Sequence, residues 1–210
     1  GLISCPEPYL KRTSHGMILG EDGEKMSKSR GNVINPDDVI RDYGADTMRL
    51  YEMFIGDFEK SAPWSTASVR GCRRFLERVY AMSELPEKQS DALTRSLHKT
   101  IKKVSDDIEN MKFNTAIAAM MSFVNDGIPK EELKTFVLLL CPFAPHLAEE
   151  LWERLGGDGF ASLQPYPVYD ASMLVSDTAE VAVQLCGKFK GTVTVPVSAS
   201  EDEVWDAVTA

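Results

Sequence analysis

Two lysines and two serines fall within five consecutive residues, Lys25-Met26-Ser27-Lys28-Ser29, and glycines flank this stretch at positions 20, 23 and 31. We expect such a segment to form a mobile loop that can close on a polyanion. Lysine supplies a compact positive charge on a flexible stem, and serine hydroxyls and loop N–H groups add donors. This combination suits the negative charge that develops on a leaving pyrophosphate. The alternative interpretation is a solvated Lys/Ser surface loop, which is common for a short motif taken alone.

The residues on either side of this loop predict the elements that position it. Residues 16–19 form a short apolar run that is expected to be a strand, and a turn at residues 20–23 lifts the loop. On the other side, Asn35 precedes a proline and two aspartates, which together form a strong start signal for a helix. Gly44 is expected to end that helix. A second helix, predicted to begin near Asp46, is expected to pack beneath the loop.

A third helix of about seventeen residues is predicted to begin after Ser65, a good N-cap residue. Its apolar residues recur at spacings of three and four and predict a buried stripe, formed by Val69, Cys72, Leu76 and Val79. Three arginines recur every four residues on a different side, namely Arg70, Arg74 and Arg78. Arg73 lies beside them, and Glu77 is the one acid of the helix core. An arginine row without matched acids favours contact with an RNA backbone, and the alternative is a solvated face.

The fourth predicted helix carries a narrow apolar stripe and a basic face. The stripe consists of Leu93, Leu97, Ile101, Val104, Ile108 and Met111. The basic face consists of Arg95, His98, Lys99, Lys102 and Lys103. Lys102 and Lys103 each have an aspartate four residues on, so we expect ion pairs within the helix to satisfy much of this charge. His98 has no evident acid or nucleophile partner and is expected to be structural.

Three more helices and a small C-terminal unit are predicted beyond this point. Pro145 is expected to start the last of the three helices, and Gly156-Gly157 to end it. The Pro-, Tyr- and Ser-rich residues 158–177 are expected to be a linker. A hairpin around residues 187–191 follows, and a capping box at Ser200–Glu203 predicts a final short helix. These elements bury little apolar surface, so this unit is predicted to be truncated.

Composition and charge exclude several classes of protein. The chain has 210 residues, 43% of them hydrophobic, which is enough for one good core and a small satellite unit. Its net charge of −9 argues against broad nucleic-acid binding, so any RNA contact must be local. The four cysteines lie far apart and no histidine stands at ligand spacing, which predicts neither disulfides nor a metal site and favours a reducing cytoplasm. No leader and no run of about eighteen apolar residues is present, so no membrane partner is expected.

The Lys/Ser motif continues through Gly44-Ala45-Asp46-Thr47 and Arg49-Leu50. The whole segment from residue 25 to residue 50 resembles the KMSKS region of class I aminoacyl-tRNA synthetases, and most closely that of the leucyl-tRNA synthetases. Residues 98–104 and 113–119 are also similar to the leucyl-tRNA synthetases, and the pattern from Pro142 to Trp152 is similar to class I synthetases in general. The resemblance covers nearly the full length of the chain.

This resemblance implies roles for individual residues. In the family, the second lysine of the motif, here Lys28, helps to bind ATP and stabilises the transition state of adenylate formation. The residues implied at the ATP site are Lys25, Met26, Ser27, Lys28 and Ser29. A similar arginine-bearing helix of the family faces tRNA, and the residues implied as tRNA contacts are Arg70, Arg74, Arg78, Lys99 and Lys102. The resemblance assigns no chemistry to His146.

The resemblance also implies a mainly α fold and a division of the chain. Residues 1–55 would end a catalytic domain with the KMSKS loop, and residues 56–157 would form a helical domain of the anticodon-binding type. The linker, 158–177, would lead to a partial α+β unit at 178–210. The parent would be a monomeric cytoplasmic leucine–tRNA ligase, which uses ATP and Mg²⁺ to form leucyl-adenylate and passes leucyl to tRNA(Leu).

Two features depart from the family pattern. Class I chemistry needs a His-x-Gly-His motif, and none of His15, His98 and His146 lies in one, so the chain by itself is expected to be inactive. At the predicted hairpin turn, Cys186 and Lys190 replace more usual residues, which weakens the prediction of a specific contact there.

Two alternatives stay open at the level of sequence. The first is a ligase for valine, isoleucine or methionine, which would share the Lys/Ser loop. Residues 98–104 and 113–119 fit the leucine family better. The second is a non-catalytic, tRNA-binding helical module that only retains the loop.

Overall fold

The computed structural model describes residues 6, 7, 9, 11–84, 91–126, 128, 130–175 and 178–209. The chain divides into two compact units, Gly1–Tyr169 and Asp170–Ala210. This division falls inside the range 158–177 that the sequence predicts to be a linker. No helix within the described ranges is long and apolar enough to cross a membrane.

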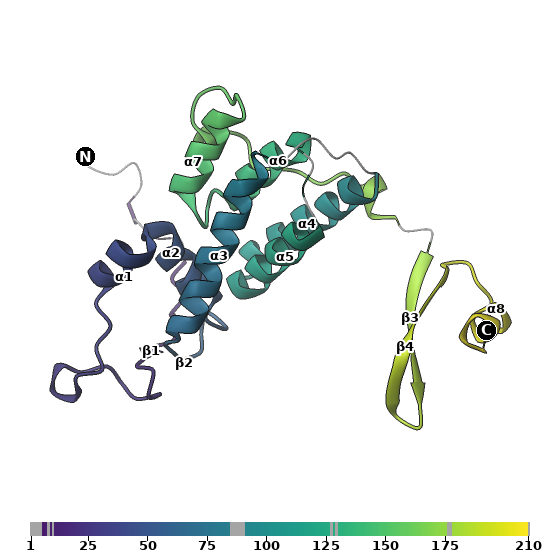
Figure 1. The fold of residues 1–210 in the computed structure, drawn as a ribbon, viewed down its shortest axis with the longest axis horizontal. Coiled ribbons are helices and arrows are strands. Elements are labelled where there is room, and N and C mark those ends of the chain that lie inside the picture. The colour runs from purple at the N-terminus through teal and green to yellow at the C-terminus, as the bar shows by residue number, and fades with distance from the viewer. Residues whose placement is uncertain are drawn as a thin grey trace. The chain divides into compact units, whose positions relative to one another are not determined.

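The described part of the first unit is mainly helical, as the sequence predicts (Figure 1). Two short parallel strands, β1 (Ile18–Leu19) and β2 (Ala62–Pro63), lie at the base of the Lys/Ser loop. The helices are α1 (Pro36–Tyr43), α2 (Ala45–Phe54), α3 (Thr66–Met82), α4 (Asp91–Glu109), α5 (Phe113–Asp126), α6 (Lys130–Leu140) and α7 (Pro145–Arg154). Two short 3-10 turns are η1 (Lys28–Arg30) and η2 (Ala161–Leu163).

Local capping side chains fix where α1 and α3 begin. The Asn35 side chain accepts a hydrogen bond from the Asp37 N–H at the start of α1, and the Ser65 side chain accepts one from the Ser68 N–H at the start of α3. Each bond satisfies one of the N–H groups that a helix start leaves without a partner. Gly44 ends α1 with a φ of 91°, in the region that favours glycine. The predicted bounds of both helices are confirmed.

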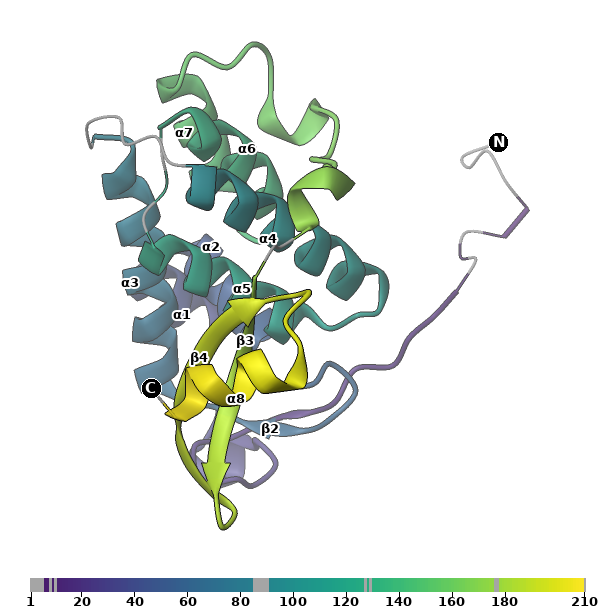
Figure 2. The same ribbon diagram turned by 90° about the vertical axis from the view of Figure 1, so that its right-hand side faces the viewer.

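The core of the first unit lies between α2, α3, α4, α5, α6 and α7. The stripe predicted for α3 is buried, and Val69, Cys72 and Val79 have no exposed surface. Burial raises the pKa of the Cys72 thiol to about 11, so this thiol stays protonated and packs as an apolar group. The ring of Phe123 from α5 packs at 5.7 Å on that of Phe136 from α6. Figure 2 shows α4 and α5 side by side within this unit.

The second unit contains an antiparallel hairpin and one helix. Its elements are η3 (Ala171–Leu174), β3 (Thr178–Leu185), β4 (Lys188–Pro196) and α8 (Glu201–Thr209). The turn at Cys186 and Gly187 has φ values of 51° and 75°, as a two-residue hairpin turn with both central residues left-handed requires. Val195 is the one buried side chain among the described residues of this unit. The predicted hairpin and short helix are confirmed, and they have little core of their own.

Candidate nucleotide-binding loop and basic helix faces

The Lys/Ser motif lies in a loop, residues 20–32, that a 3-10 turn closes. This turn, η1, contains the second lysine of the motif, and the Ser27 side chain caps it by accepting a hydrogen bond from the Arg30 N–H at 3.3 Å. Gly31 follows with a φ of 68°, which favours glycine. The serine of the motif and the glycine after it therefore shape the loop locally.

Asn32 organises the loop from within. Its side-chain oxygen accepts a hydrogen bond from the Ser27 N–H at 2.9 Å, and its NH₂ group donates to the two carboxylate oxygens of Asp22 at 3.0 and 3.2 Å. The same nitrogen lies 3.4 Å from the Lys25 carbonyl oxygen. These bonds hold the backbone around the lysines in one curve. The sequence does not reveal this role of Asn32, because the bonds form only once the loop curves back on itself.

The acids of the loop are engaged with partners other than the lysines. The Glu24 carboxylate pairs with the Arg30 guanidinium at 2.9 Å. Asp22 accepts hydrogen bonds from Asn32 and from the Glu24 N–H at 3.0 Å, and the latter bond lowers the pKa of its carboxyl group. Glu21 points out of the loop to the start of α3. No loop acid is left to neutralise the motif.

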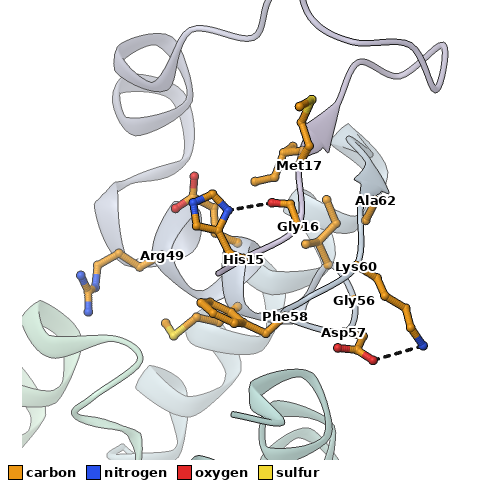
Figure 3. Close-up of a pocket in the computed structure, with 13 residues that line it drawn as sticks. His15, Gly16, Met17, Arg49, Gly56, Asp57, Phe58, Lys60 and Ala62 are labelled. Atoms are coloured by element: carbon orange, nitrogen blue, oxygen red, sulfur yellow. Dashed lines mark hydrogen bonds and ion pairs between the residues drawn. The ribbon is translucent and has the colours of Figure 1, made fainter. Parts of the chain in front are cut away.

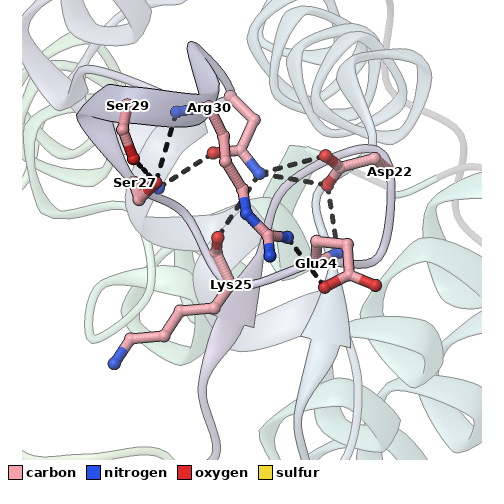
Figure 4. A network of polar contacts seen from close by, with 7 residues as sticks. Asp22, Glu24, Lys25, Ser27, Ser29 and Arg30 are labelled. Carbon is pink, nitrogen blue, oxygen red and sulfur yellow. Dashed lines mark hydrogen bonds and ion pairs between the residues drawn. The ribbon is translucent and has the colours of Figure 1, made fainter.

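Lys25 and Lys28 are the free cations of the loop. Both side chains are exposed, and within the described residues neither ammonium group has a hydrogen-bond or ion-pair partner. Figure 4 shows the Lys25 side chain extending away from the polar network. The hydroxyl oxygens of Ser27 and Ser29 lie 3.0 Å apart, while Met26 is partly buried against the core. A loop that carries two free ammonium groups and two hydroxyls can bind a polyphosphate.

The arginine row of α3 is exposed, but its members differ in their partners. The Arg70 Nε lies 3.4 Å from the Tyr43 hydroxyl at the end of α1, and Arg78 donates to the Asn125 side chain of α5. Arg74 lies between them and contacts no acceptor in the described part of the chain. Arg74 is therefore the member of the row that is available to an external anion.

Arg73, beside the row, holds the end of α1. Its guanidinium donates to the Tyr43 carbonyl oxygen at 3.0 Å and pairs with Glu77 at 2.7 Å. Tyr43 is the last residue of α1, and the carbonyl groups at a helix end lack partners and carry partial negative charge. Arg73 thus fixes the helix that follows the loop to α3.

Two lysines of the basic face of α4 are neutralised within the helix, as the sequence predicts. Lys102 pairs with Asp106, and its ammonium group lies 5.7 Å from the centre of the Tyr169 ring. Lys103 contacts both oxygens of the aspartate four residues on, each at 2.6 Å. Lys99 is exposed and contacts no acceptor among the residues that the structure describes. The predicted ion pairs are confirmed, and Lys99 is the free lysine of this face.

Asp46 and His146 join α2 to α7. The Asp46 carboxylate accepts a hydrogen bond from the Leu147 N–H at 2.7 Å and lies 2.8 Å from the His146 Nδ1. Both partners lie in the first turn of α7, where the N-cap residue, Ala144, has no side chain that could cap it. A carboxylate from another helix therefore caps α7. The sequence did not reveal this contact, because its partners are a hundred residues apart.

A pocket of about 420 Å³ lies between the end of α2 and β1 (Figure 3). Two of its polar side chains bond to other residues of the pocket wall. His15 Nδ1 lies 2.7 Å from the Gly16 carbonyl oxygen, and Lys60 pairs with Asp57 at 3.2 Å. Burial raises the pKa of Glu52 on its wall. No residue of the Lys/Ser motif lines this pocket.

The described residues contain no group of three or more His, Cys, Asp or Glu side chains that could hold a metal ion. Cys72, Cys141 and Cys186 have free thiols, and Cys5 lies outside the described residues. The part of the chain that the structure describes therefore offers the Mg²⁺ that the resemblance implies no cluster of three or more such side chains.

Comparison with known proteins identifies the family of the chain. The family model of class I tRNA synthetases (I, L, M and V) matches residues 3–64, and the model of the anticodon-binding domain of tRNA ligase matches residues 91–133 and 127–204. Leucine–tRNA ligases from Alkaliphilus oremlandii and Sorangium cellulosum are each 50% identical to this chain, over 212 and 210 residues. The chain belongs to the leucine–tRNA ligase family. The predicted likeness to the leucine–tRNA ligases is confirmed.

The chain spans about a quarter of the length of these leucine–tRNA ligases. The alignments cover 97% of this chain, but 26% and 25% of the two relatives. A ternary LeuRS–tRNA–LeuAMS complex from Agrobacterium radiobacter superposes with a TM-score of 0.76 and 30% identity, over 97% of this chain and 30% of that one. Mycobacterium tuberculosis methionyl-tRNA synthetase in complex with methionyl-adenylate has a TM-score of 0.57 and 18% identity, over 69% of this chain and 38% of that one, and shares the fold alone.

Proposed function

We propose that this chain is the part of a leucine–tRNA ligase that brings the KMSKS loop to adenylate formation and a basic helix face to tRNA(Leu). In that reaction the leucine carboxylate attacks the α-phosphate of ATP, and pyrophosphate leaves. Negative charge grows on the leaving oxygens, and cationic donors held nearby lower the barrier. Lys28 is the residue to which we assign this task, with Lys25 and the two serine hydroxyls in support.

The proposal rests on how the charged side chains of the loop are paired. The Glu24 carboxylate is paired with Arg30, and the Asp22 carboxylate is held by Asn32, whereas both motif lysines are exposed and unpaired within the described residues. A lysine without an internal partner keeps its full charge for a ligand. A merely solvated Lys/Ser loop would not need its acids placed so consistently away from its lysines.

The proposed activity needs the rest of the enzyme. Lys28 lowers a barrier only for a substrate that other residues hold in place, and the chain has no His-x-Gly-His motif. We therefore propose that the chain alone forms no adenylate. We assign no step to Mg²⁺, because the described residues offer it no ligand cluster. Detectable pyrophosphate exchange by the isolated chain would contradict this division of labour.

The tRNA contact is proposed to rest mainly on the basic groups that have no internal partner. Arg74 on α3 and Lys99 on α4 are exposed and contact no acceptor among the described residues, so they can reach phosphates without breaking a bond. Arg70, Arg78 and Lys102 already have partners, and we propose that they contribute less. The ternary complex that resembles this chain contains tRNA, which supports the choice of partner.

The test of the central assignment is Lys28→Ala in the full-length ligase. We expect pyrophosphate exchange to slow by at least about tenfold, which corresponds to about 1.4 kcal/mol of barrier. Lys60→Ala is the matched control, because Lys60 is an exposed lysine that pairs with Asp57 outside the loop. It is expected to exchange at the unmodified rate. An unchanged rate for Lys28→Ala would remove the assignment.

A further inference from the structure

A carboxylate that the sequence analysis did not single out ties the loop to the first residue of α3. The Glu21 Oε1 accepts hydrogen bonds from the Thr66 hydroxyl at 2.6 Å and from the Thr66 N–H at 3.1 Å. The two residues meet because β1 and β2 run parallel, and each residue follows shortly after the carboxyl end of its strand. A carboxylate at this point also lies at the positive end of the α3 dipole.

The receiving side of this contact is built into the core. The Thr66 hydroxyl oxygen also accepts a hydrogen bond from the Trp64 indole N–H at 3.2 Å. The Trp64 ring is 5% exposed and packs edge-on against the Tyr51 ring, with centroids 4.7 Å apart. The Tyr51 hydroxyl in turn accepts a hydrogen bond from the Ser65 N–H at 2.7 Å. The start of α3 is thus held by two buried aromatic side chains, and it gives Glu21 a fixed partner.

The other side-chain hydrogen bonds of the loop stay within it. Asn32 bonds to Asp22 and to the Ser27 N–H, and Arg30 bonds to Glu24. Among the described residues, Glu21 is the one side chain of residues 20–32 whose hydrogen bonds reach another element. Without it the internal network would keep the loop folded, but no side-chain hydrogen bond of the described residues would hold the loop to α3, and only the packing of Met26 against the core would remain.

We propose that Glu21 is a positioning residue of the KMSKS loop, which sets where Lys28 lies by holding the turn at residues 20–23 on the N-terminus of α3. The inference rests on the function proposed for Lys28. Glu21 also connects the loop to the helix that carries the proposed tRNA contact, because Arg74 lies on α3. The hydrogen bonds from Thr66 hold the pKa of the Glu21 carboxyl below its ordinary value, so it stays ionised at neutral pH.

The first measurement is pyrophosphate exchange by the full-length ligase. Glu21→Ala is expected to lower kcat about fivefold, the effect of about one hydrogen bond, with the KM for leucine unchanged because the loop acts on the leaving group. Glu21→Gln keeps an acceptor oxygen in the same place and should restore part of the rate. Glu24→Gln is the matched control: it removes an ion pair that lies entirely within the loop and should change kcat less than about twofold.

The second measurement is tryptic cleavage after Lys25, Lys28 and Arg30 in the 210-residue chain. Glu21→Ala should raise the cleavage rate about fivefold, since cleavage follows the population of the open loop. Lys28→Ala is assayed for exchange alongside. If Lys28→Ala leaves exchange unchanged, the proposed function fails. If Lys28→Ala slows exchange while Glu21→Ala alters neither kcat nor cleavage, or if Glu21→Ala loses helix content and raises the KM for leucine, the positioning role is overturned.

Discussion

Two pairs of closely spaced lysines in this chain look alike in sequence and differ in what surrounds them. Lys25 and Lys28 lie on a loop whose acids bond elsewhere, and neither has a partner among the described residues. Lys102 and Lys103 lie on α4, each paired with the aspartate one helical turn further on. A basic residue is therefore available to a ligand when the backbone places no acid within its reach. Counting charges does not reveal this.

The arginine row of α3 shows the same contrast within one helix. Arg70 and Arg78 share the spacing of Arg74, yet both donate to side chains of neighbouring helices. These two guanidinium groups bond to α1 and α5, and Arg74 is left for a partner.

The largest effect is expected at the buried aspartate that pairs with Lys103. Asp107 is 4% exposed, pairs with Lys103 at 2.6 Å and accepts a hydrogen bond from the Thr115 hydroxyl at 2.7 Å. Asp107→Ala leaves both groups without their partner and should lower the free energy of unfolding by about 2 kcal/mol, measured by urea denaturation. Asp106→Asn, at an exposed pair, should lower it by less than about 0.5 kcal/mol. Equal losses would contradict the distinction.

A second prediction concerns a variant that gives Lys28 an acidic neighbour. Ser29→Glu places a carboxylate beside Lys28, where it can neutralise the ammonium group that we assign to the leaving pyrophosphate. Pyrophosphate exchange by the full-length ligase should slow by at least about tenfold, or about 1.4 kcal/mol of barrier. Ser29→Gln, with nearly the same shape and no charge, is the control and should be faster than Ser29→Glu. Equal rates for the two variants would show that charge on this loop does not matter.

A third prediction compares free and engaged cations at the tRNA surface. Arg74→Ala should weaken binding of tRNA(Leu) to the full-length ligase and lower the slope of log affinity against log salt by about one, because one phosphate contact is lost. Arg70→Ala should lower this slope less, since Arg70 already donates to Tyr43. Adenylate formation should stay unchanged in both. A larger loss for Arg70→Ala would reverse the proposed order of the two residues.

The smallest effect concerns the pH dependence of the loop anchor. Hydrogen bonds from Thr66 lower the pKa of Glu21, so the bond should persist when the pH falls through the ordinary glutamate pKa of about 4.3 and should weaken only below it. The amide chemical shift of Thr66, followed by NMR, should therefore titrate with a midpoint below that value. A midpoint at or above the ordinary value would show that the carboxylate is not held at α3.

The sequence predicts the parts of this structure that depend on near neighbours. Asn35 and Ser65 cap helices whose first residues follow them directly, and Lys102 meets an acid one turn away. These contacts are fixed by helical geometry alone. The family likeness then points to the loop, because the motif is contiguous.

The remainder depends on residues that only the fold brings together. Glu21 and Thr66 meet through a strand pair, and Arg78 finds Asn125 on another helix. Hydrophobic periodicity tells which face of a helix is buried, but it does not tell which exposed guanidinium will find an acceptor. For this reason the sequence predicts a row of equivalent arginines, and the structure distinguishes one of them.

The most direct test is lysine-specific acetylation of the full-length ligase, quantified residue by residue with mass spectrometry, with and without ATP and leucine. We predict that Lys25 and Lys28 react faster than Lys102 and Lys103 in the free enzyme, and that ATP with leucine protects Lys28. The α4 lysines should react equally under both conditions. A Lys28 that reacts no faster than Lys103, or that ATP leaves unprotected in an active enzyme, would contradict the account.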